Sequence, residues 1–127
     1  MSLTSSVQDR KLEMMKGRAV TAFEQRVYDQ VSLVPVGRVT TYAEMSKALD
    51  CHSAQAIGQA LKRNPFAPEV PCHRVIRADH SIGGYAGQTG GEKLELKLSL
   101  LKSEGVEFNS VGKLVLPEKL FLFGARD

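Results

Sequence analysis

Apolar residues recur at helical spacing early in the chain, after an arm of mixed polarity. Residues 1 to about 20 show no clean apolar period, and some helix is expected near Leu12 to Lys16. The apolar positions that follow are spaced as on one face of a helix: Phe23, Val27, Val31 and Val34. Thr21 and Glu24 form a capping-box pattern at the start of this run. The pattern predicts a helix from Thr21 to about Leu33, which Val34-Pro35-Val36-Gly37 ends.

Two shorter helices are predicted next. Thr41 and Glu44 give a second capping-box pattern, and the helix that it opens should end near Leu49. After a tight connection through Cys51, Ser53 can cap a third helix that reaches about Arg63. Two short helices with so short a connection are typical of a helix-turn-helix.

The third helix has one apolar face and one face of small and polar residues. At helical periodicity, the residues expected to pack inward are Ala54, Ile57, Gly58 and Leu61. The opposite face and its flank carry Ala56, Gln59 and Arg63, with Gln55 and Lys62. Helices that read the major groove present longer base-reading side chains, whereas small residues allow a close approach to the minor groove. An ordinary helix hairpin with a solvated face fits the same pattern.

The middle of the chain is predicted to be irregular. Two prolines exclude regular structure from Asn64 to Glu69, and a short apolar segment follows at Val75-Ile76. The glycine-rich stretch Ile82–Gly91 indicates a loop whose backbone can approach a partner closely, or simply a mobile surface loop.

The C-terminal part is predicted to contain one more helix. Residues 92–103 place Leu94, Leu98 and Leu101 at helical spacing. Leucines also alternate there as they would in a strand, but the length and the many Glu, Lys and Leu residues favour a helix. Gly105 is a plausible stop, and a short hairpin or extended tail is expected from Val106 to Val115.

Composition is that of one globular domain. The chain has 127 residues, of which 43% are hydrophobic and 24% charged. No apolar run approaches the length of a membrane span, and the first residues lack the apolar core of a secretory signal. An intracellular protein without a membrane partner is therefore expected. The net charge of +3 and the pI near 9.0 are compatible with a nucleic-acid partner but do not establish one.

The two cysteines each precede a histidine. In a reducing compartment a cysteine is a buried small side chain, an incidental thiol or a nucleophile. Cys51-His52 and Cys72-His73 lack the usual gap between metal ligands, so no metal site is predicted. In Val70–Ile76, Cys72 beside His73 and behind a proline suggests a thiol activated by a base, acting through one water and oriented by a carboxylate. From the spacing alone, structural burial of both residues is the more common explanation of such a pair.

Several motifs, in order and almost without gaps, resemble the O6-alkylguanine-DNA alkyltransferases, also called methylated-DNA–protein-cysteine methyltransferases. Pro71-Cys72-His73-Arg74-Val75-Ile76 resembles the active-site signature of that family, and this motif is highly specific. The flanking segments that resemble other family motifs are Val36–Tyr42, Asn64-Pro65, Gly83–Gly87 and Leu100–Gly105. The resemblance covers about Thr21 to Leu116. It implies a mainly α fold with small β elements and a winged-helix-like helix-turn-helix.

The resemblance also implies a domain assignment. Residues 21–127 correspond to the family's C-terminal DNA-binding and catalytic domain. Residues 1–20 form an arm in place of the larger N-terminal domain that many members carry.

The resemblance assigns a role to each residue of the expected site. Cys72 is the alkyl acceptor, His73 its water-mediated base and Glu104 the carboxylate that orients the histidine. Asn64 braces the active-site turn, and Tyr42 pushes the phosphate of the target nucleotide and donates a proton toward guanine N3. The slot for the flipped base is lined by Leu61, Val75, Tyr85, Ala86 and Gly87. DNA contacts are expected from Tyr42, Ser53, Gln55, Ala56, Gln59, Lys62 and Arg63.

The activity that the resemblance implies is direct reversal of DNA damage. The stacked base must leave the helix before a thiolate can reach the alkyl carbon. The thioether product has no easy route back and no cofactor is expected, so each molecule should act once, as a stoichiometric methyltransferase. The expected partner is double-stranded DNA that contains O6-alkylguanine. The protein is expected to be a monomer in the nucleus of a eukaryote or in the cytoplasm of a prokaryote.

Two positions depart from the family pattern. The recognition helix of the family usually carries an arginine that fills the gap left by the flipped base, and Gln55 stands at that position. Glutamine can still hydrogen-bond an orphaned cytosine but lacks the charge and the reach. The stretch from Gly87 to Glu104 is also several residues longer than is common, around Gln88 to Glu92, and this is expected to alter the pocket rim and the alkyl groups that fit.

Three other functions share parts of this pattern. A non-catalytic alkyltransferase-like protein would bind lesions and recruit other factors, but those proteins carry another residue where this chain has Cys72. A helix-turn-helix regulator leaves the Cys72-His73 motif unexplained. A thiol hydrolase would use the same pair but would turn over repeatedly without DNA.

Overall fold

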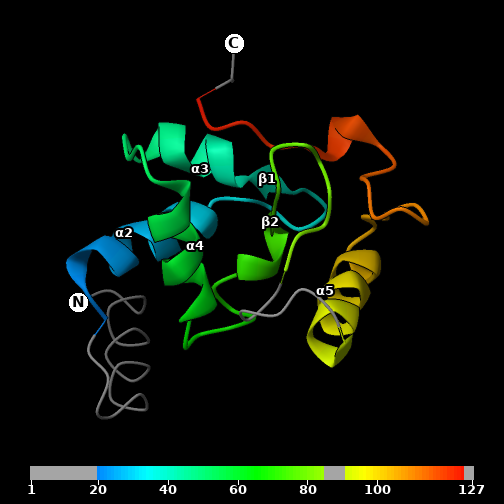
Figure 1. The fold of residues 1–127 in the computed structure, drawn as a ribbon, viewed down its shortest axis with the longest axis horizontal. Helices are drawn as coiled ribbons and strands as arrows, with labels where there is room; N and C mark the ends of the chain where they lie inside the picture. The colour runs from blue at the N-terminus through cyan, green and yellow to red at the C-terminus, as the bar shows by residue number, and fades with distance from the viewer. Residues whose placement is uncertain (1–19, 85–90, 125–127) are drawn as a thin grey trace.

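In the computed structural model, residues 20–84 and 91–124 are described. Helices α2, α3 and α4 pack together on one side of a short pair of parallel strands, and helix α5 lies on the other side (Figure 1). The mainly helical fold with small β elements is therefore confirmed. The N-terminal arm, with the helix expected near Leu12 to Lys16, and the loop residues Tyr85, Ala86 and Gly87 lie outside the described residues.

Helix α2 spans Ala22–Val31, two residues shorter at its end than the pattern predicted. Its capping box is complete: Glu24 N donates to Thr21 Oγ1 at 3.0 Å, and Thr21 N donates to Glu24 Oε1 at 3.1 Å. The buried face carries Val27, Tyr28 and Val31. Since backbone donors at a helix start have no partner within the helix, this box sets where α2 begins.

Helices α3 (Tyr42–Ala48) and α4 (Ala54–Lys62) form the predicted helix-turn-helix. Thr41 caps α3 by accepting from Glu44 N at 3.1 Å, but the Glu44 side chain lies 3.6 Å from Lys47 instead of completing a capping box. Ser53 caps α4 by accepting from Ala56 N at 3.0 Å.

The apolar face of α4 differs from the prediction at two positions, Ala54 and Ala60. Ile57, Ala60 and Leu61 are buried, whereas Ala54, which was expected to pack inward, is exposed. Ala54 is the first residue of α4, before the helix has made a turn against its neighbours, and this explains its exposure.

Strands β1 (Thr40–Thr41) and β2 (Val75–Ile76) are parallel, with Thr40 opposite Val75 and Thr41 opposite Ile76. All these side chains are buried. Because β1 runs directly into α3 and β2 directly follows the Cys72 turn, this pairing holds the start of α3 next to the cysteine.

Helix α5 spans Gly91–Ser103, so the helical reading of the leucine-rich segment is confirmed. The helix ends as predicted at Gly105, which has φ +88°. Gly105 N donates to Lys102 O and Val106 N to Leu101 O, the bonding pattern of a Schellman motif. Beyond it, Phe108 and Leu114 form an antiparallel bridge, as expected for a short hairpin.

Two apolar clusters meet at the strand pair. The first contains the inner faces of α2, α3 and α4 together with Cys72 and Val75. The second contains Val39, Ile76, Leu101 and Val106. Helix α5 borders both, because Leu100 packs against the first cluster while Leu94 and Leu98 pack against the second. In the described part of the chain, no helix has both the length and the apolar character needed to cross a bilayer.

Candidate active site

Cys72 lies in a single 3₁₀ turn, η1 (Cys72–Arg74), that leads into β2. Cys72 N donates to Val70 O at 2.8 Å and Arg74 N to Pro71 O at 2.9 Å, which holds the turn closed. The Cys72 side chain is 8% exposed and belongs to the first apolar cluster. Successive residues of a 3₁₀ helix are about 120° apart, so Cys72, His73 and Arg74 point in different directions.

His73 and Glu104 are in direct contact, as the sequence predicted. His73 Nε2 lies 3.0 Å from Glu104 Oε2, and the two side chains are 2% and 14% exposed. A carboxylate accepts only, so Nε2 carries the proton in this pair and Nδ1 is the basic nitrogen. Nδ1 is buried and has no hydrogen-bond partner among the described residues.

Arg74 holds the carboxylate from its other side. Arg74 Nε donates to Glu104 Oε1 at 3.0 Å and Nη2 to Oε2 at 2.8 Å, while Nη1 donates to Val34 O at 2.9 Å. This bidentate pair fixes the plane of the carboxylate that His73 contacts. Sequence reasoning gave Arg74 no role, although it stands inside the most specific motif.

The site keeps the imidazole neutral and the carboxylate ionised. Burial lowers the pKa of His73, although the hydrogen bond and the charge of Glu104 oppose this, and Arg74 and Lys97 lower it further. The pKa of Glu104 is lowered as well: desolvation acts in the opposite direction, but the bonds from Arg74 and His73 outweigh it. A neutral imidazole that is oriented by a carboxylate can accept a proton.

Lys97 is a fully buried cation beside this site. Its Nζ donates to Val75 O at 2.8 Å, to Ile82 O at 2.7 Å and to Gly84 O at 2.9 Å. Burial lowers the pKa of Lys97 to about 7, while the proximity of Cys72 raises it. Three carbonyls match the three N–H donors of an ammonium group, so Lys97 ties β2 to the segment that enters the glycine-rich loop. The sequence offered one signal for Lys97, a lysine at a helix position between leucines.

Tyr42 and Asn64, two further residues of the expected site, both lie near Cys72. Tyr42 is the first residue of α3 and packs against the cluster that contains Cys72. Burial raises the pKa of its hydroxyl, with Cys72 adding to the effect and Arg77 opposing it. Asn64 Nδ2 donates to Val70 O at 2.8 Å, and its Oδ1 accepts from Phe66 N at 2.9 Å. Asn64 therefore ties the end of α4 to the segment before Cys72.

A cavity of about 380 Å³ opens beside Cys72. Its wall combines four predicted site residues with five residues that the sequence did not point to. The lining residues are Leu61, Lys62, Asn64, Ala67, Pro68, Cys72, Lys93, Leu96 and Leu100. Val75, another predicted slot residue, is fully buried at β2, and Tyr85, Ala86 and Gly87 lie outside the described residues.

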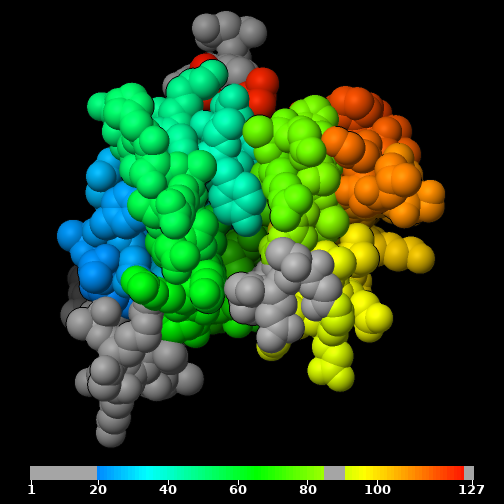
Figure 2. All heavy atoms as spheres, in the orientation of Figure 1, coloured from blue at the N-terminus to red at the C-terminus, as the bar shows by residue number. Residues whose placement is uncertain are grey.

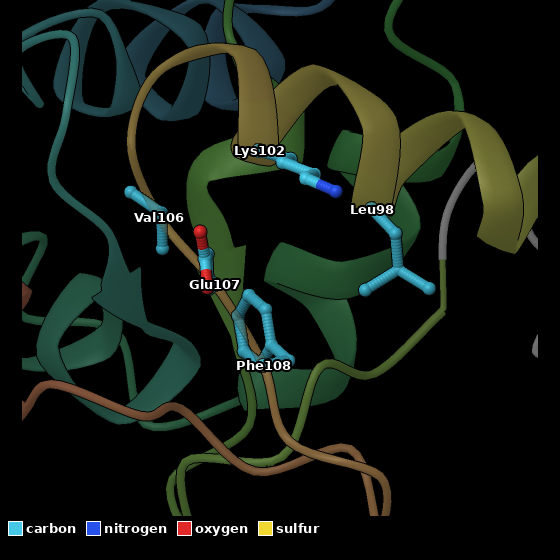
Figure 3. A pocket seen from close by; sticks show the side chains of 5 residues that line it. All are labelled: Leu98, Lys102, Val106, Glu107 and Phe108. Carbon is cyan, nitrogen blue, oxygen red and sulfur yellow. The ribbon is translucent and has the colours of Figure 1, made fainter.

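A second, smaller cavity of about 150 Å³ lies on the opposite face of α5 (Figure 3). Leu98 and Lys102 line it from the helix, facing Val106, Glu107 and Phe108 of the next segment (Figure 3). Residues two positions apart on a helix point about 200° apart, so Leu98 and Leu100 belong to different cavities. This cavity contains no nucleophile.

Most of the predicted DNA-contacting residues lie on α4 or at its two caps, whereas Tyr42 is the first residue of α3. Green atoms of α4 lie at the surface in Figure 2. Gln55, Gln59 and Lys62 are exposed and Ala56 is half-buried. Arg63 lies 3.5 Å from Glu24, which links the end of α4 to the start of α2, and its side chain remains 59% exposed. Ser53 uses its hydroxyl to cap the helix.

The histidines and cysteines do not converge with acidic residues on a metal site. In residues 20–84 and 91–124, no group of three or more His, Cys, Asp or Glu side chains could hold an ion. Cys51 lies instead at a separate hollow along α3 and the turn, together with His52 and Asp50.

Sequence comparison matches the chain to one protein family and to several individual relatives. Residues 22–106 match the family described as 6-O-methylguanine DNA methyltransferase, DNA binding domain. The methylated-DNA–protein-cysteine methyltransferase of Methanothermobacter thermautotrophicus is 41% identical over 98 residues, 77% of this chain and 52% of that protein. The chain spans about half the length of the curated relatives it matches.

Solved structures agree with this assignment. The Mycobacterium tuberculosis OGT, crystallised in complex with DNA, is 36% identical with a TM-score of 0.60, covering 68% of this chain and 51% of that one. S. pombe Atl1, crystallised with damaged DNA containing O6-carboxymethylguanine, is 33% identical with a TM-score of 0.62. That match covers 78% of this chain and 94% of the Atl1 chain.

Proposed function

Because the chain belongs to the 6-O-methylguanine DNA methyltransferase family through its DNA-binding domain, we propose that it moves an alkyl group from O6 of guanine in double-stranded DNA onto Cys72. The observation that carries the proposal is the chain of contacts from Arg74 through Glu104 to His73, next to a cysteine at the edge of a cavity. One molecule would repair one lesion and then remain alkylated. One Cys72 and one α4 face suffice for one lesion, so the protein would act as a monomer.

The residues of the site support a simple sequence of proton transfers. His73 Nδ1, whose basicity follows from the Nε2–Glu104 contact, would accept the thiol proton of Cys72 through one bridging water. The thiolate would then attack the alkyl carbon, the bond from that carbon to O6 would break, and O6 would keep the electron pair. Guanine would take up one proton as it leaves, and Tyr42, at the start of α3, would supply it.

DNA binding would use the exposed face of α4. Ala56 allows a close approach of the helix, and Gln55 would occupy the space left by the flipped base. Glutamine brings no charge to that position. We therefore expect weaker lesion capture than an arginine would give, with Lys62 and Arg63 supplying phosphate contacts.

A second candidate is a lesion-binding protein that performs no transfer. The match over 94% of S. pombe Atl1, which was crystallised with damaged DNA, favours it. Cys72, His73 and Glu104 have no purpose in that reading, so we rank it second.

Intact mass measurement separates the candidates. The protein is incubated with duplex DNA containing O6-methylguanine, beside Cys72→Ser and beside Cys51→Ser as the matched control. Transfer predicts a mass gain of one methylene, located at Cys72, in the wild type and in Cys51→Ser but not in Cys72→Ser. Tight lesion binding without any mass gain would contradict transfer and support the second candidate.

A further inference from the structure

The cavity beside Cys72 has a wall that methyl transfer alone does not require. A methyl group is about the size of a water molecule, whose share of liquid volume is about 30 Å³, whereas this cavity measures about 380 Å³. The predicted base slot accounts for the side at Leu61. The additional wall comes from Ala67 and Pro68 and from the face of α5 that carries Leu96 and Leu100.

The α5 wall is apolar beside the cysteine and cationic at one end. Leu96 is 45% exposed and lines the cavity, so it gives this wall an apolar surface that an alkyl group can contact. Lys93 lies about one turn before Leu96, in the first turn of α5, where the helix dipole is also positive. Lys62 lines the cavity from the end of α4.

These two lysines leave a positive charge in the cavity. Neither forms an ion pair with any residue in the described part of the chain. The described residues that line the cavity include no aspartate or glutamate. A group held in this cavity therefore has apolar side chains and ammonium groups among its neighbours, and the described lining residues supply no carboxylate to neutralise that charge.

We infer that the Cys72 cavity favours lesions whose alkyl group carries a carboxylate, and that Lys93, assisted by Lys62, recognises that charge. The inference rests on the proposed transfer to Cys72 and names its preferred substrate class. O6-carboxymethylguanine is the simplest such lesion. Its methylene would lie against Cys72 Sγ while the carboxylate points toward α5.

The transfer step is the same for this lesion as for a methyl group. The Sγ–carbon bond forms, the carbon–O6 bond breaks, and O6 keeps the electron pair. Guanine takes its proton from Tyr42, Cys72 passes its proton through water to His73, and proton exchange with solvent restores both groups. The carboxylate is unchanged, so the product is S-carboxymethylcysteine. No oxidant, reductant or second substrate takes part.

The experiment compares three duplexes that differ only in the O6 substituent: methyl, carboxymethyl and the uncharged carbamoylmethyl, which has nearly the shape of carboxymethyl. Single-turnover rate constants are measured for the wild type, for Lys93→Met and for Lys102→Met, with the adduct located by mass. Lys102 is the matched control, because it lies on the same helix but faces the other cavity. Phosphate contacts act on all three duplexes equally, so the carboxymethyl-to-carbamoylmethyl ratio isolates recognition of the lesion's charge.

We expect the wild type and Lys102→Met to favour carboxymethyl over carbamoylmethyl by up to about fivefold, the upper range for one exposed ion pair. In Lys93→Met the ratio should fall close to one while methyl transfer is retained. Equal ratios in the wild type and Lys93→Met, with methyl transfer intact, would overturn the inference and leave the proposed function standing. Failure of the wild type to accept even the methyl group would overturn both.

Discussion

At the scale of single residues, Glu104 connects the two halves of the site. Its carboxylate accepts from His73 and from two nitrogens of Arg74, and it stands at the C-cap of α5, where the Schellman motif fixes the backbone. An amide at this position would place an N–H group against His73 or against Arg74. Both the basicity of His73 and the orientation of its ring depend on that contact.

The first prediction therefore concerns Glu104→Gln. We expect the single-turnover rate constant for O6-methylguanine to fall at least about tenfold. This is less than the roughly 100-fold or more expected for complete loss of a general base, because His73 itself remains. The control is Glu107→Gln, three residues further on and exposed. Equal rates for the two variants would show that His73 does not depend on Glu104. A pH profile of the rate for both variants distinguishes lost basicity from local misfolding.

The second prediction concerns Lys97→Met. The substitution keeps the length of the side chain but leaves the carbonyls of Val75, Ile82 and Gly84 without their donor. We expect the free energy of unfolding to fall by about 3 kcal/mol. Lys102→Met, on the exposed side of the same helix, should stay within about 0.5 kcal/mol of the wild type. Urea unfolding followed by far-UV circular dichroism measures both, and a Lys97→Met protein as stable as the wild type would contradict the assigned role.

The role of a residue could be predicted where a short sequence motif marks it. It could not be predicted where the role depends on contacts with distant parts of the chain. Cys72, His73 and Glu104 came from motifs, and the structure brings His73 and Glu104 together. The role of Arg74 depends on reaching Glu104, thirty positions away in the chain. Lys97 depends on three carbonyls from two other segments, which no local pattern reveals.

At the scale of elements, the caps fixed most of the helix starts. Thr21, Thr41 and Ser53 each accept from a backbone N–H in the helix that follows, as the sequence indicated. The pairing of β1 with β2 was not predictable, because a strand of two residues has no period to detect. The alternating leucines of α5 are explained by its position: Leu100 packs against the first cluster, Leu94 and Leu98 pack against the second, and Leu96 lines the cavity. Leucines therefore lie on more than one side of the helix.

The third prediction uses the cap of α4 to separate folding from DNA contact. Ser53→Ala removes the acceptor for Ala56 N and should lower the free energy of unfolding by about 1 kcal/mol. Ser53→Asp retains a capping oxygen and should keep the stability near that of the wild type. If the start of α4 faces DNA phosphates, the added negative charge should weaken duplex binding, most strongly at low salt. Unchanged affinity of Ser53→Asp at low salt would place the start of α4 away from the DNA.

At the scale of the whole molecule, the buried charges of the site couple folding to pH. A group whose pKa is lower in the folded protein stabilises the fold above its unfolded pKa, and this contribution is lost as the pH falls. The ordinary pKa is 6.5 for His73 and 4.5 for Glu104, and folding lowers the pKa of both groups. Folding lowers the pKa of Lys97 from 10.5 to about 7. This group therefore acts in the same direction at higher pH: the free energy of unfolding rises as the pH increases from about 7 to 10.5. The three groups thus act in the same direction over successive pH ranges.

The fourth prediction follows from this order. The free energy of unfolding should fall as the pH drops below 6.5, with His73 contributing a slope of at most about 1.4 kcal/mol per pH unit, the value for one proton. In His73→Gln this first part of the decline should disappear, while the later decline through the Glu104 range remains. The chain has no tryptophan, so far-UV circular dichroism during urea titration at a series of pH values is the suitable measurement. If His73→Gln kept the wild-type slope just below pH 6.5, the imidazole would not be held neutral by burial. The proposed proton transfer from Cys72 to His73 would then lose its physical basis.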